Sequence, residues 1–162
     1  DRQFTADLNP KYYGGIQNQI RYKGWNLDFL FQFVKQQNRL FPMGTAGLMS
    51  NQQARMSDSW KQEGQNSTYQ MYTTGINGTA VTADGNYSLS NAQITDASFI
   101  RLKNISLSYD IPLNLKSTNC KVMLQAQNLL TITKYPDGDP EFTTYGYLSP
   151  LKDVTAGMQL TF

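Results

Sequence analysis

The chain ends with Leu151-Lys-Asp-Val-Thr-Ala-Gly-Met-Gln-Leu-Thr-Phe162, which carries the clearest structural pattern in the sequence. From Val154 onward, apolar residues alternate strictly with uncharged polar residues or glycine. Since successive side chains of a strand point to opposite sides, the pattern predicts a strand with one apolar and one polar face. The uncharged polar face and the terminal aromatic residue favour a strand of a membrane barrel over a strand of a soluble sandwich.

The composition excludes several classes of function. The chain has 162 residues, 16% of them charged, and its net charge is +2 with lysine and arginine scattered, so we expect no nucleic-acid partner. Histidine is absent, which removes the common nucleophile–base sets and the usual zinc sites from this chain. We therefore expect no enzyme, no catalytic residues, no cofactor and no metal. Cys120 is expected to be a small buried residue, and no apolar run is long enough for a transmembrane helix.

Four more segments alternate with the period of a strand. The first two form a hairpin through Lys23-Gly24, and the second carries five large apolar residues on one face. The third changes phase in its middle, so either a bulge lies near Lys103-Asn104, or Arg101 and Lys103 extend beyond the apolar band. The predicted strands cover residues 14–23, 25–37, 99–109, 121–132 and 152–162.

The connections alternate between short and long. The long ones, residues 38–98 and 133–150, are rich in turn residues, with signals such as Asn77-Gly78 and Asp84-Gly85, and we expect a short helix over 51–63. Short turns on one side and long loops on the other are typical of outer-membrane barrels. The predicted fold class is therefore all-β: an antiparallel up-and-down transmembrane β-barrel segment of about five C-terminal strands, with long extracellular loops.

Five segments, in chain order, carry a resemblance to a known family. They are Asn9-Pro-Lys-Tyr-Tyr-Gly-Gly15; Tyr22-Lys-Gly-Trp25; Asp96-Ala-Ser-Phe-Ile-Arg-Leu-Lys-Asn-Ile-Ser-Leu-Ser-Tyr-Asp-Ile-Pro112; Gln127-Asn-Leu-Leu-Thr-Ile-Thr-Lys-Tyr135 with Asp139-Pro-Glu141; and the final strand. Together they resemble the end of the barrel of SusC/RagA-type TonB-dependent outer-membrane transporters.

The resemblance implies roughly the C-terminal fifth or sixth of a larger protein with an N-terminal plug and a barrel of about 22 strands. The start at Asp1, without a methionine, agrees with a processed or truncated piece. The implied function is TonB-dependent import of oligosaccharides or peptides across the outer membrane of a Gram-negative cell, within a SusCD-like nutrient-uptake complex. The implied partners are a SusD-like surface lipoprotein, the plug and upstream strands, TonB through the missing N-terminal part, the outer-membrane assembly machinery and membrane lipid.

Aromatic residues in the long loops are candidates for contacts with a ligand or partner, because exposed loop aromatics often bind. The alternative role for each is local packing of its loop. The candidates are Trp60, Tyr69, Tyr72, Tyr87, Tyr145 and Tyr147. Phe162 is, as the resemblance implies, a candidate assembly signal, and otherwise an interface aromatic of the last strand. Trp25, Phe29, Phe31 and Phe33 fit lipid-facing positions better than a ligand platform.

Polar strand residues form a further candidate set. They are candidates to line a solute path, or else to bond to a plug and water; they are Gln17, Gln19, Arg21, Gln125, Gln127, Gln159 and Thr161. Asp137-Gly-Asp139-Pro-Glu141 superficially resembles a calcium loop but lacks the other ligands, so a turn is predicted. The alternative function is a soluble β-sandwich module that binds carbohydrate through loop aromatics, with the apolar strand faces packed inward.

Overall fold

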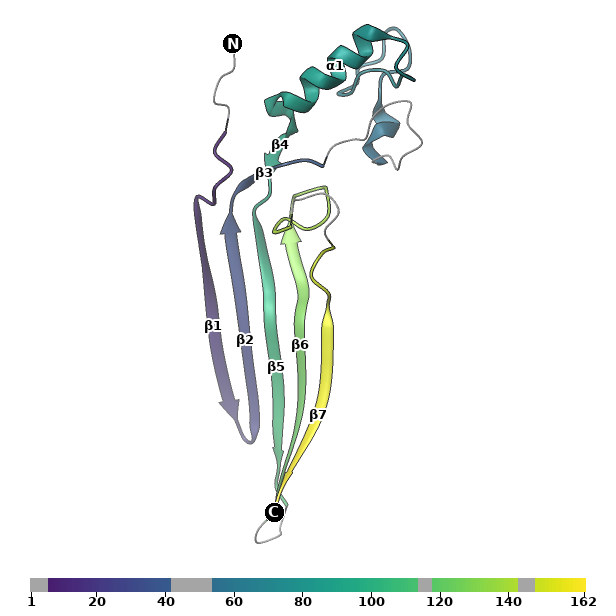
Figure 1. The fold of residues 1–162 in the computed structure, drawn as a ribbon. Helices are drawn as coiled ribbons and strands as arrows, with labels where there is room; N and C mark the ends of the chain where they lie inside the picture. Colours follow the sequence, from purple (N-terminus) through teal and green to yellow (C-terminus); the bar gives the residue numbers. More distant parts are fainter. Residues whose placement is uncertain (1–5, 42–53, 114–117, 143–147) are drawn as a thin grey trace.

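The computed structural model describes residues 6–41, 54–113, 118–142 and 148–162. Its main element is one antiparallel sheet of five long strands in up-and-down order (Figure 1). Across the sheet the strands are β1 (Tyr12–Tyr22), β2 (Trp25–Lys35), β5 (Phe99–Ile111), β6 (Asn119–Thr133) and β7 (Asp153–Thr161). The long connections lie at one end of the sheet, and the hairpin turn and the C-terminus lie at the other.

The register divides the side chains of the sheet into two faces. Trp25 lies opposite Tyr22 on β1 and Tyr109 on β5, and this face continues as an apolar surface across all five strands. Ile16 and Met158, on the two edge strands, are 60% and 65% exposed. The other face is mainly polar. The sequence of each strand therefore specifies both its direction and the chemistry of each side.

No second layer covers the apolar face in the part of the chain that the structure describes. The helices and the short strands lie beyond the ends of the long strands (Figure 1), where Asp96 of β4 contacts Lys35 at the end of β2. The soluble sandwich alternative requires two facing sheets with the apolar faces packed inward. The described residues form one such sheet only, so the sandwich prediction is wrong for this part of the chain.

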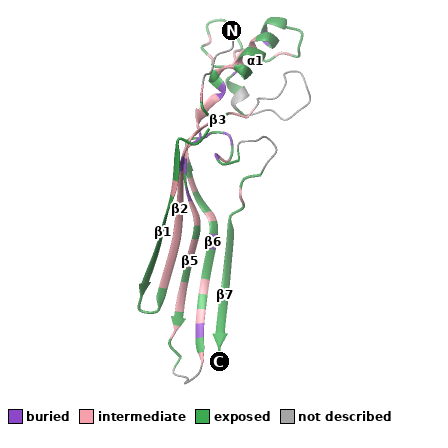
Figure 2. Ribbon diagram, turned by 60° about the vertical axis from the view of Figure 1, so that its left-hand side comes forward, coloured by how far each residue is buried: buried purple, intermediate pink, exposed green. Residues whose placement is uncertain are grey.

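Most of the buried residues gather where the strands meet the long connections (Figure 2). They include Val34, Ala97, Phe99, Tyr135 and Pro140, which come from three separate parts of the chain. Two further buried residues, Cys120 and Ala126, lie on β6, and the burial of Cys120 confirms the prediction. The core is therefore a small cluster at one end of the sheet.

A bulge interrupts the pairing of β5 with both of its neighbours. Leu30 and Phe31 pair with Asn104 and Leu102, which leaves Lys103 as the extra residue. Asn128 on β6, next to the bulge, has a positive φ of 53°, a conformation that asparagine tolerates better than most residues. Of the two explanations for the phase change in this strand, the bulge is confirmed.

The hairpin between β1 and β2 closes through two residues with positive φ. Lys23 has a φ of 44° and Gly24 one of 85°, as a type I′ turn requires. The carbonyl of Gly24 accepts a hydrogen bond of 2.9 Å from the amide of Asp110. A Cβ added to Gly24 would lie 3.2 Å from the carbonyl oxygen of that residue, so the turn needs glycine there.

The connection between β2 and β5 contains more regular structure than predicted. Close to the sheet, β3 (Gln37–Arg39) and β4 (Ile94–Asp96) form a two-stranded antiparallel sheet. The described part of this connection also contains two 3₁₀ helices, η1 (Ala54–Asp58) and η2 (Asn91–Gln93), and one α-helix, α1 (Gly78–Leu89). Among the described residues, none of the helices combines the length and apolar composition needed to cross a membrane.

The α-helix lies where the sequence predicted turns. The side chain of Asn77 caps the helix by accepting a hydrogen bond of 3.1 Å from the amide of Ala80, and Asp84-Gly85 lies inside the helix. Asparagine is as favourable at a helix cap as in a turn, so the same residues suit both structures. The helix predicted over 51–63 is wrong beyond the short 3₁₀ turn of η1, and residues 51–53 lie outside the described part.

Candidate functional site

Two of the predicted loop aromatics, Trp60 and Tyr69, line one cavity of about 350 Å³ in the long loop. The amide of Trp60 donates to the carbonyl of Tyr69 at 2.9 Å, so the backbone holds the two side chains close together. Met71, Ala80 and Ala83 complete the apolar part of the wall, and hydroxyl and amide side chains form the rest. The residues that line this cavity are all uncharged, which suits a neutral polar ligand or an uncharged protein segment.

The other loop candidates have different surroundings. Tyr87 on α1 packs edge-to-face against Tyr69, with ring centroids 5.5 Å apart, and so supports the wall of the cavity. Tyr72 is 43% exposed and is not among the residues that line the cavity. Tyr145 and Tyr147 lie outside the described residues. The structure therefore brings together Trp60, Tyr69 and Tyr87 and leaves Tyr72 apart.

The predicted solute-path residues share the polar face of the sheet. Gln17 and Gln19 lie on β1, and Gln125 and Gln127 pair with Thr155 and Asp153 across β6 and β7. Contacts among the polar side chains are sparse and long, such as 3.5 Å from Gln17 Nε2 to an oxygen of Asp28. These groups are spread over a wide surface and have donors and acceptors left for water or another partner.

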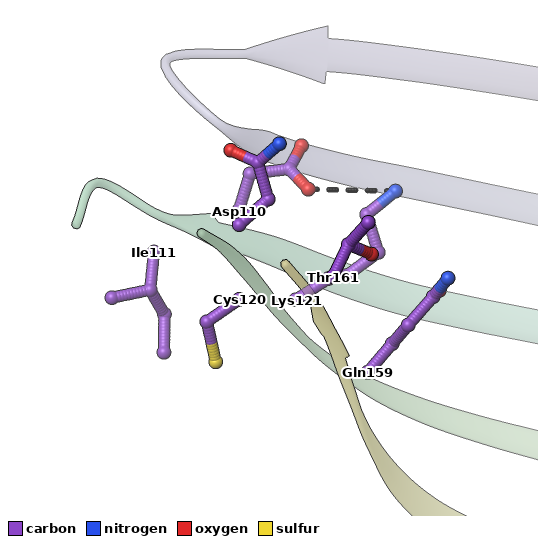
Figure 3. Close-up of a pocket in the computed structure, with 7 residues that line it drawn as sticks. Asp110, Ile111, Cys120, Lys121, Gln159 and Thr161 are labelled. Carbon is purple, nitrogen blue, oxygen red and sulfur yellow. Dashed lines mark ion pairs between the residues drawn. The ribbon is translucent and has the colours of Figure 1, made fainter. Parts of the chain in front are cut away.

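A shallow cavity of about 390 Å³ lies at the opposite end of the sheet, near the C-terminus (Figure 3). It contains an ion pair of 3.4 Å between Lys121 Nζ and Asp110, and both side chains are substantially exposed. Gln159 and Thr161 border the same cavity. Because an exposed ion pair contributes little, this cavity is a weaker candidate than the cavity in the long loop.

A site that the sequence pattern did not predict is centred on the buried side chain of Arg101. Its side chain is 1% exposed, and Nη2 donates to both carboxylate oxygens of Asp139 at 2.7 and 2.6 Å. Nη1 donates to Glu141 at 2.8 Å, and Nε donates to the hydroxyl of Thr131 at 3.0 Å. Lys103, the bulged residue, adds an ion pair of 3.1 Å to Glu141. Two cations and two carboxylates thus balance one another.

The segment that supplies these carboxylates also contacts the base of the long loop. Asp137 accepts a hydrogen bond of 2.6 Å from the amide of Phe41, and the carbonyl of Pro140 accepts one of 2.7 Å from the side chain of Gln36. The hydroxyl of Tyr135 donates to the carbonyl of Arg39 at 2.6 Å. The turn predicted for Asp137–Glu141 is present, with Gly138 at a φ of 78°. Its acidic residues bind protein groups, and the described residues contain no cluster suited to a metal ion.

The base of the loop is also held by the carboxylate of Asp96. The hydroxyl of Ser98 donates to it, Lys35 Nζ lies 2.9 Å away, and the amide of Ser98 donates at 2.9 Å. These donors, the Ser98 hydroxyl first, hold the pKa of the Asp96 carboxyl well below its usual range because they stabilise the charged form. The charged form of Asp96 is therefore stabilised by its neighbours in the folded chain.

Comparisons with known proteins agree with the geometry. A TonB-dependent receptor P3 from Formosa agariphila is 28% identical over 149 residues, which cover 87% of this chain and 14% of the receptor. The solved RagAB peptide importer in its closed-closed state contains a chain with a TM-score of 0.71 and 27% identity, over 99% of this chain and 19% of that chain. The chain is similar to SusC/RagA-type TonB-dependent transporters. No family model matches it.

The SusC/RagA resemblance read from the five sequence segments is thereby confirmed, together with the barrel-type fold. The same importer in its open-open state gives a TM-score of 0.67 with 25% identity. This SusC/RagA-like chain spans less than a fifth of the length of these relatives. They are named as a receptor and as importers, which agrees with the expectation of a protein that is not an enzyme.

The last residue of this SusC/RagA-like segment is almost fully exposed. Phe162 follows the end of β7 and is 96% exposed. β7 forms one edge of the sheet and β1 the other, so both present unpaired backbone groups. Within the described residues Phe162 is therefore available to a partner. Its role as an assembly signal stays a prediction.

Proposed function

We propose that this chain is the C-terminal part of a transmembrane barrel in the outer membrane of a Gram-negative cell. The observation that carries the proposal is the exposed apolar face, which continues across all five strands and is not covered by any element of the described residues. A surface of this extent is incompatible with exposure to water and fits contact with lipid chains. The polar face then lines the lumen.

The orientation follows from the loops and the aromatic residues. Long loops face outward in such barrels and short turns face the periplasm. At the short-turn end, the rings of Trp25 and Tyr109 lie 4.6 Å apart, and Lys23 Nζ lies 5.2 Å from the ring of Tyr22. Aromatic and basic residues at the rim of an apolar band suit the interface with lipid head groups. Phe162 lies at the same end, where we assign it to recognition by the assembly machinery.

We further propose that the complete protein imports a nutrient without chemical change, driven by TonB. The similarity to a TonB-dependent receptor and to the RagAB peptide importer supports this proposal. Upstream strands of the same transporter would pair with the two open edges, β1 and β7, and the plug would occupy the lumen. The solute is a peptide or an oligosaccharide, and the similarity to RagAB makes peptides the first to test.

The long loop provides the proposed contact surface on the outside. The cavity beside Trp60 and Tyr69 combines aromatic rings with neutral hydrogen-bonding groups. Such a wall suits either a neutral part of the solute or a segment of the SusD-like lipoprotein. Tyr87 contributes by holding Tyr69 in place.

The proposal is tested with an antibody against the C-terminus on fractionated source cells, followed by uptake assays. We expect a band several times larger than this chain in the outer-membrane fraction. Uptake of labelled peptides, or else of labelled oligosaccharides, should cease when the gene is deleted or the proton gradient is dissipated. A soluble band of the size of this chain would overturn the membrane assignment. An outer-membrane band with unchanged uptake of both solutes would overturn the import assignment alone.

A further inference from the structure

Residues 133–142, called here the latch segment, begin at the last residue of β6 and turn back over the polar face. The buried guanidinium of Arg101 on β5 binds the carboxylates of Asp139 and Glu141 from that segment. Pro140, between them, is fully buried. A segment that simply continued β6 would leave the sheet, so these charge-assisted hydrogen bonds determine its path.

The latch segment contacts both arms of the long loop. On the incoming arm it binds the side chain of Gln36 through Pro140 and the amide of Phe41 through Asp137. On the returning arm, the hydroxyl of Thr133 donates to the carbonyl of Ser98 at 2.8 Å. The two arms bond to each other as well, through β3 and β4. The roots of the two long connections therefore form one unit, and Arg101 is its most deeply buried charged group.

We propose that Arg101 is a positioning residue for import, because it keeps the latch segment on the polar face and thereby holds the roots of both long loops. This inference rests on the proposed function, in which the polar face is the solute path. The latch segment then lies at the outer mouth of that path and fixes the two arms from which the long loop extends. Arg101 acts through the carboxylates and does not touch the solute.

The geometry explains why arginine is required. Its planar fork binds one carboxylate with two bonds and the other with a third, while Nε binds Thr131. Lysine offers a single charged nitrogen and does not span both carboxylates. Methionine preserves much of the apolar stem and leaves both carboxylates without their main partner, so the latch segment should leave the face.

The first experiment measures whether the latch segment is released, in the full-length transporter with Cys120→Ala and any other thiols removed. Pro140→Cys places a thiol at a fully buried position, and a membrane-impermeant maleimide reports its exposure on intact cells. We expect Arg101→Met to raise the labelling rate at least tenfold, and Arg101→Lys to raise it less. The matched control is Arg21→Met on the same face, because Arg21 makes only a 3.4 Å contact with Gln19 among the described side chains. It should leave the rate unchanged.

The second experiment measures uptake and separates positioning from loss of folding. Arg101→Met should lower uptake at least fivefold while the heat-modifiable folded band of the barrel remains. If that variant does not assemble, the same comparison is made with Arg101→Lys. The double variant Arg101→Met, Asp139→Asn leaves Lys103 paired with Glu141 and so restores the charge balance but not the tether, and it should remain defective in uptake.

The outcomes are distinguishable. An unchanged labelling rate in Arg101→Met would show that Arg101 does not hold the latch segment on the polar face. Faster labelling with normal uptake would show that the latch segment is held by Arg101 but that import does not depend on it. Restored uptake in the double variant also overturns the positioning role, because it would show that uncompensated charge was the whole defect. If the wild-type protein imports nothing, the proposed function fails, while the labelling experiment still reports on the latch.

Discussion

Introducing one arginine on the apolar face tests most directly whether this face contacts lipid. Leu124 lies on β6 between Leu107 and Ala156, and its side chain is 49% exposed, so arginine fits there without a steric clash. If water covered this face, Leu124→Arg would change stability by less than about 0.5 kcal/mol, as for most surface substitutions. If lipid covers this face, the loss of unfolding free energy depends on how deep the new arginine lies in the bilayer.

The depth can be worked out from the strand. The apolar face of β6 runs from Cys120 to Ile132, which places its midpoint near Ala126. With about 3.4 Å per residue and a tilt of about 45°, Leu124 lies roughly 5 Å from the midpoint and Val122 roughly 10 Å. Arginine costs about 2–4 kcal/mol at the midplane and about 0–1 near the interfaces. We therefore expect about 2–3 kcal/mol for Leu124→Arg and about 1 kcal/mol for Val122→Arg.

The assay is urea unfolding of the full-length transporter reconstituted in phospholipid vesicles. Gln125→Arg is the matched control, because this neighbour of Leu124 lies on the polar face, and its unfolding free energy should stay within about 0.5 kcal/mol of wild type. Equal costs at Leu124 and Val122, or no cost at either, would refute the assignment of this face to lipid. A cost at Gln125 as large as that at Leu124 would refute the division into two faces.

Three further predictions concern the loop cavity, the C-terminus and the base of the loop. Trp60→Ala should raise the half-saturating solute concentration for uptake about tenfold, which is the effect of a moderate hot spot. Tyr72→Ala should leave this concentration within about twofold of wild type. Equal effects of the two substitutions would contradict the assignment of the loop cavity to solute binding. Phe162→Ala should reduce the amount of assembled barrel in the outer membrane several-fold at unchanged synthesis, measured by immunoblot, and normal amounts would exclude the assembly signal. Asp96 has a lowered pKa, so its contribution to stability is present above its usual value of 3.8 and is lost as the pH falls toward the folded-state value. Asp96→Asn should consequently lower the urea midpoint more at pH 7 than at pH 3, and a pH-independent difference would contradict this linkage.

The sheet was predictable from the sequence because each strand carries its own evidence. Alternation in the C-terminal strand specifies two faces without reference to any other segment, and Lys23-Gly24 specifies the hairpin turn that the structure shows. The break in phase at Lys103 similarly predicts a bulge in the strand that contains it. These are local signals, and a pattern of period two is difficult to produce by any other structure.

The helix and the Arg101 site were not predictable in the same way. Asn77 suits a turn and a helix cap equally well, and only the residues packed around it decide between the two. Arg101 stands among apolar residues in its strand, and its partners Asp139 and Glu141 follow nearly forty residues later. A charge within a strand and a cluster of acids in a distant loop were both visible, but the sequence alone does not pair them.

The location of the Arg101 site follows from the two environments that meet there. Along most of the sheet, one face needs only apolar side chains and the other only polar ones, so no side chain requires a specific partner. At the outer ends of β5 and β6, however, the chain leaves the sheet for the long connections, and Val34 and Phe99 on the polar face must be covered. The latch segment covers this end, and its acidic residues require a cation that the strand supplies as Arg101.

Removal of one partner from such a buried pair costs about 3–5 kcal/mol, which is enough to move a loop without unfolding a barrel. The boundary between sheet and loops is thus where a single residue has the largest influence on the shape of the outer mouth.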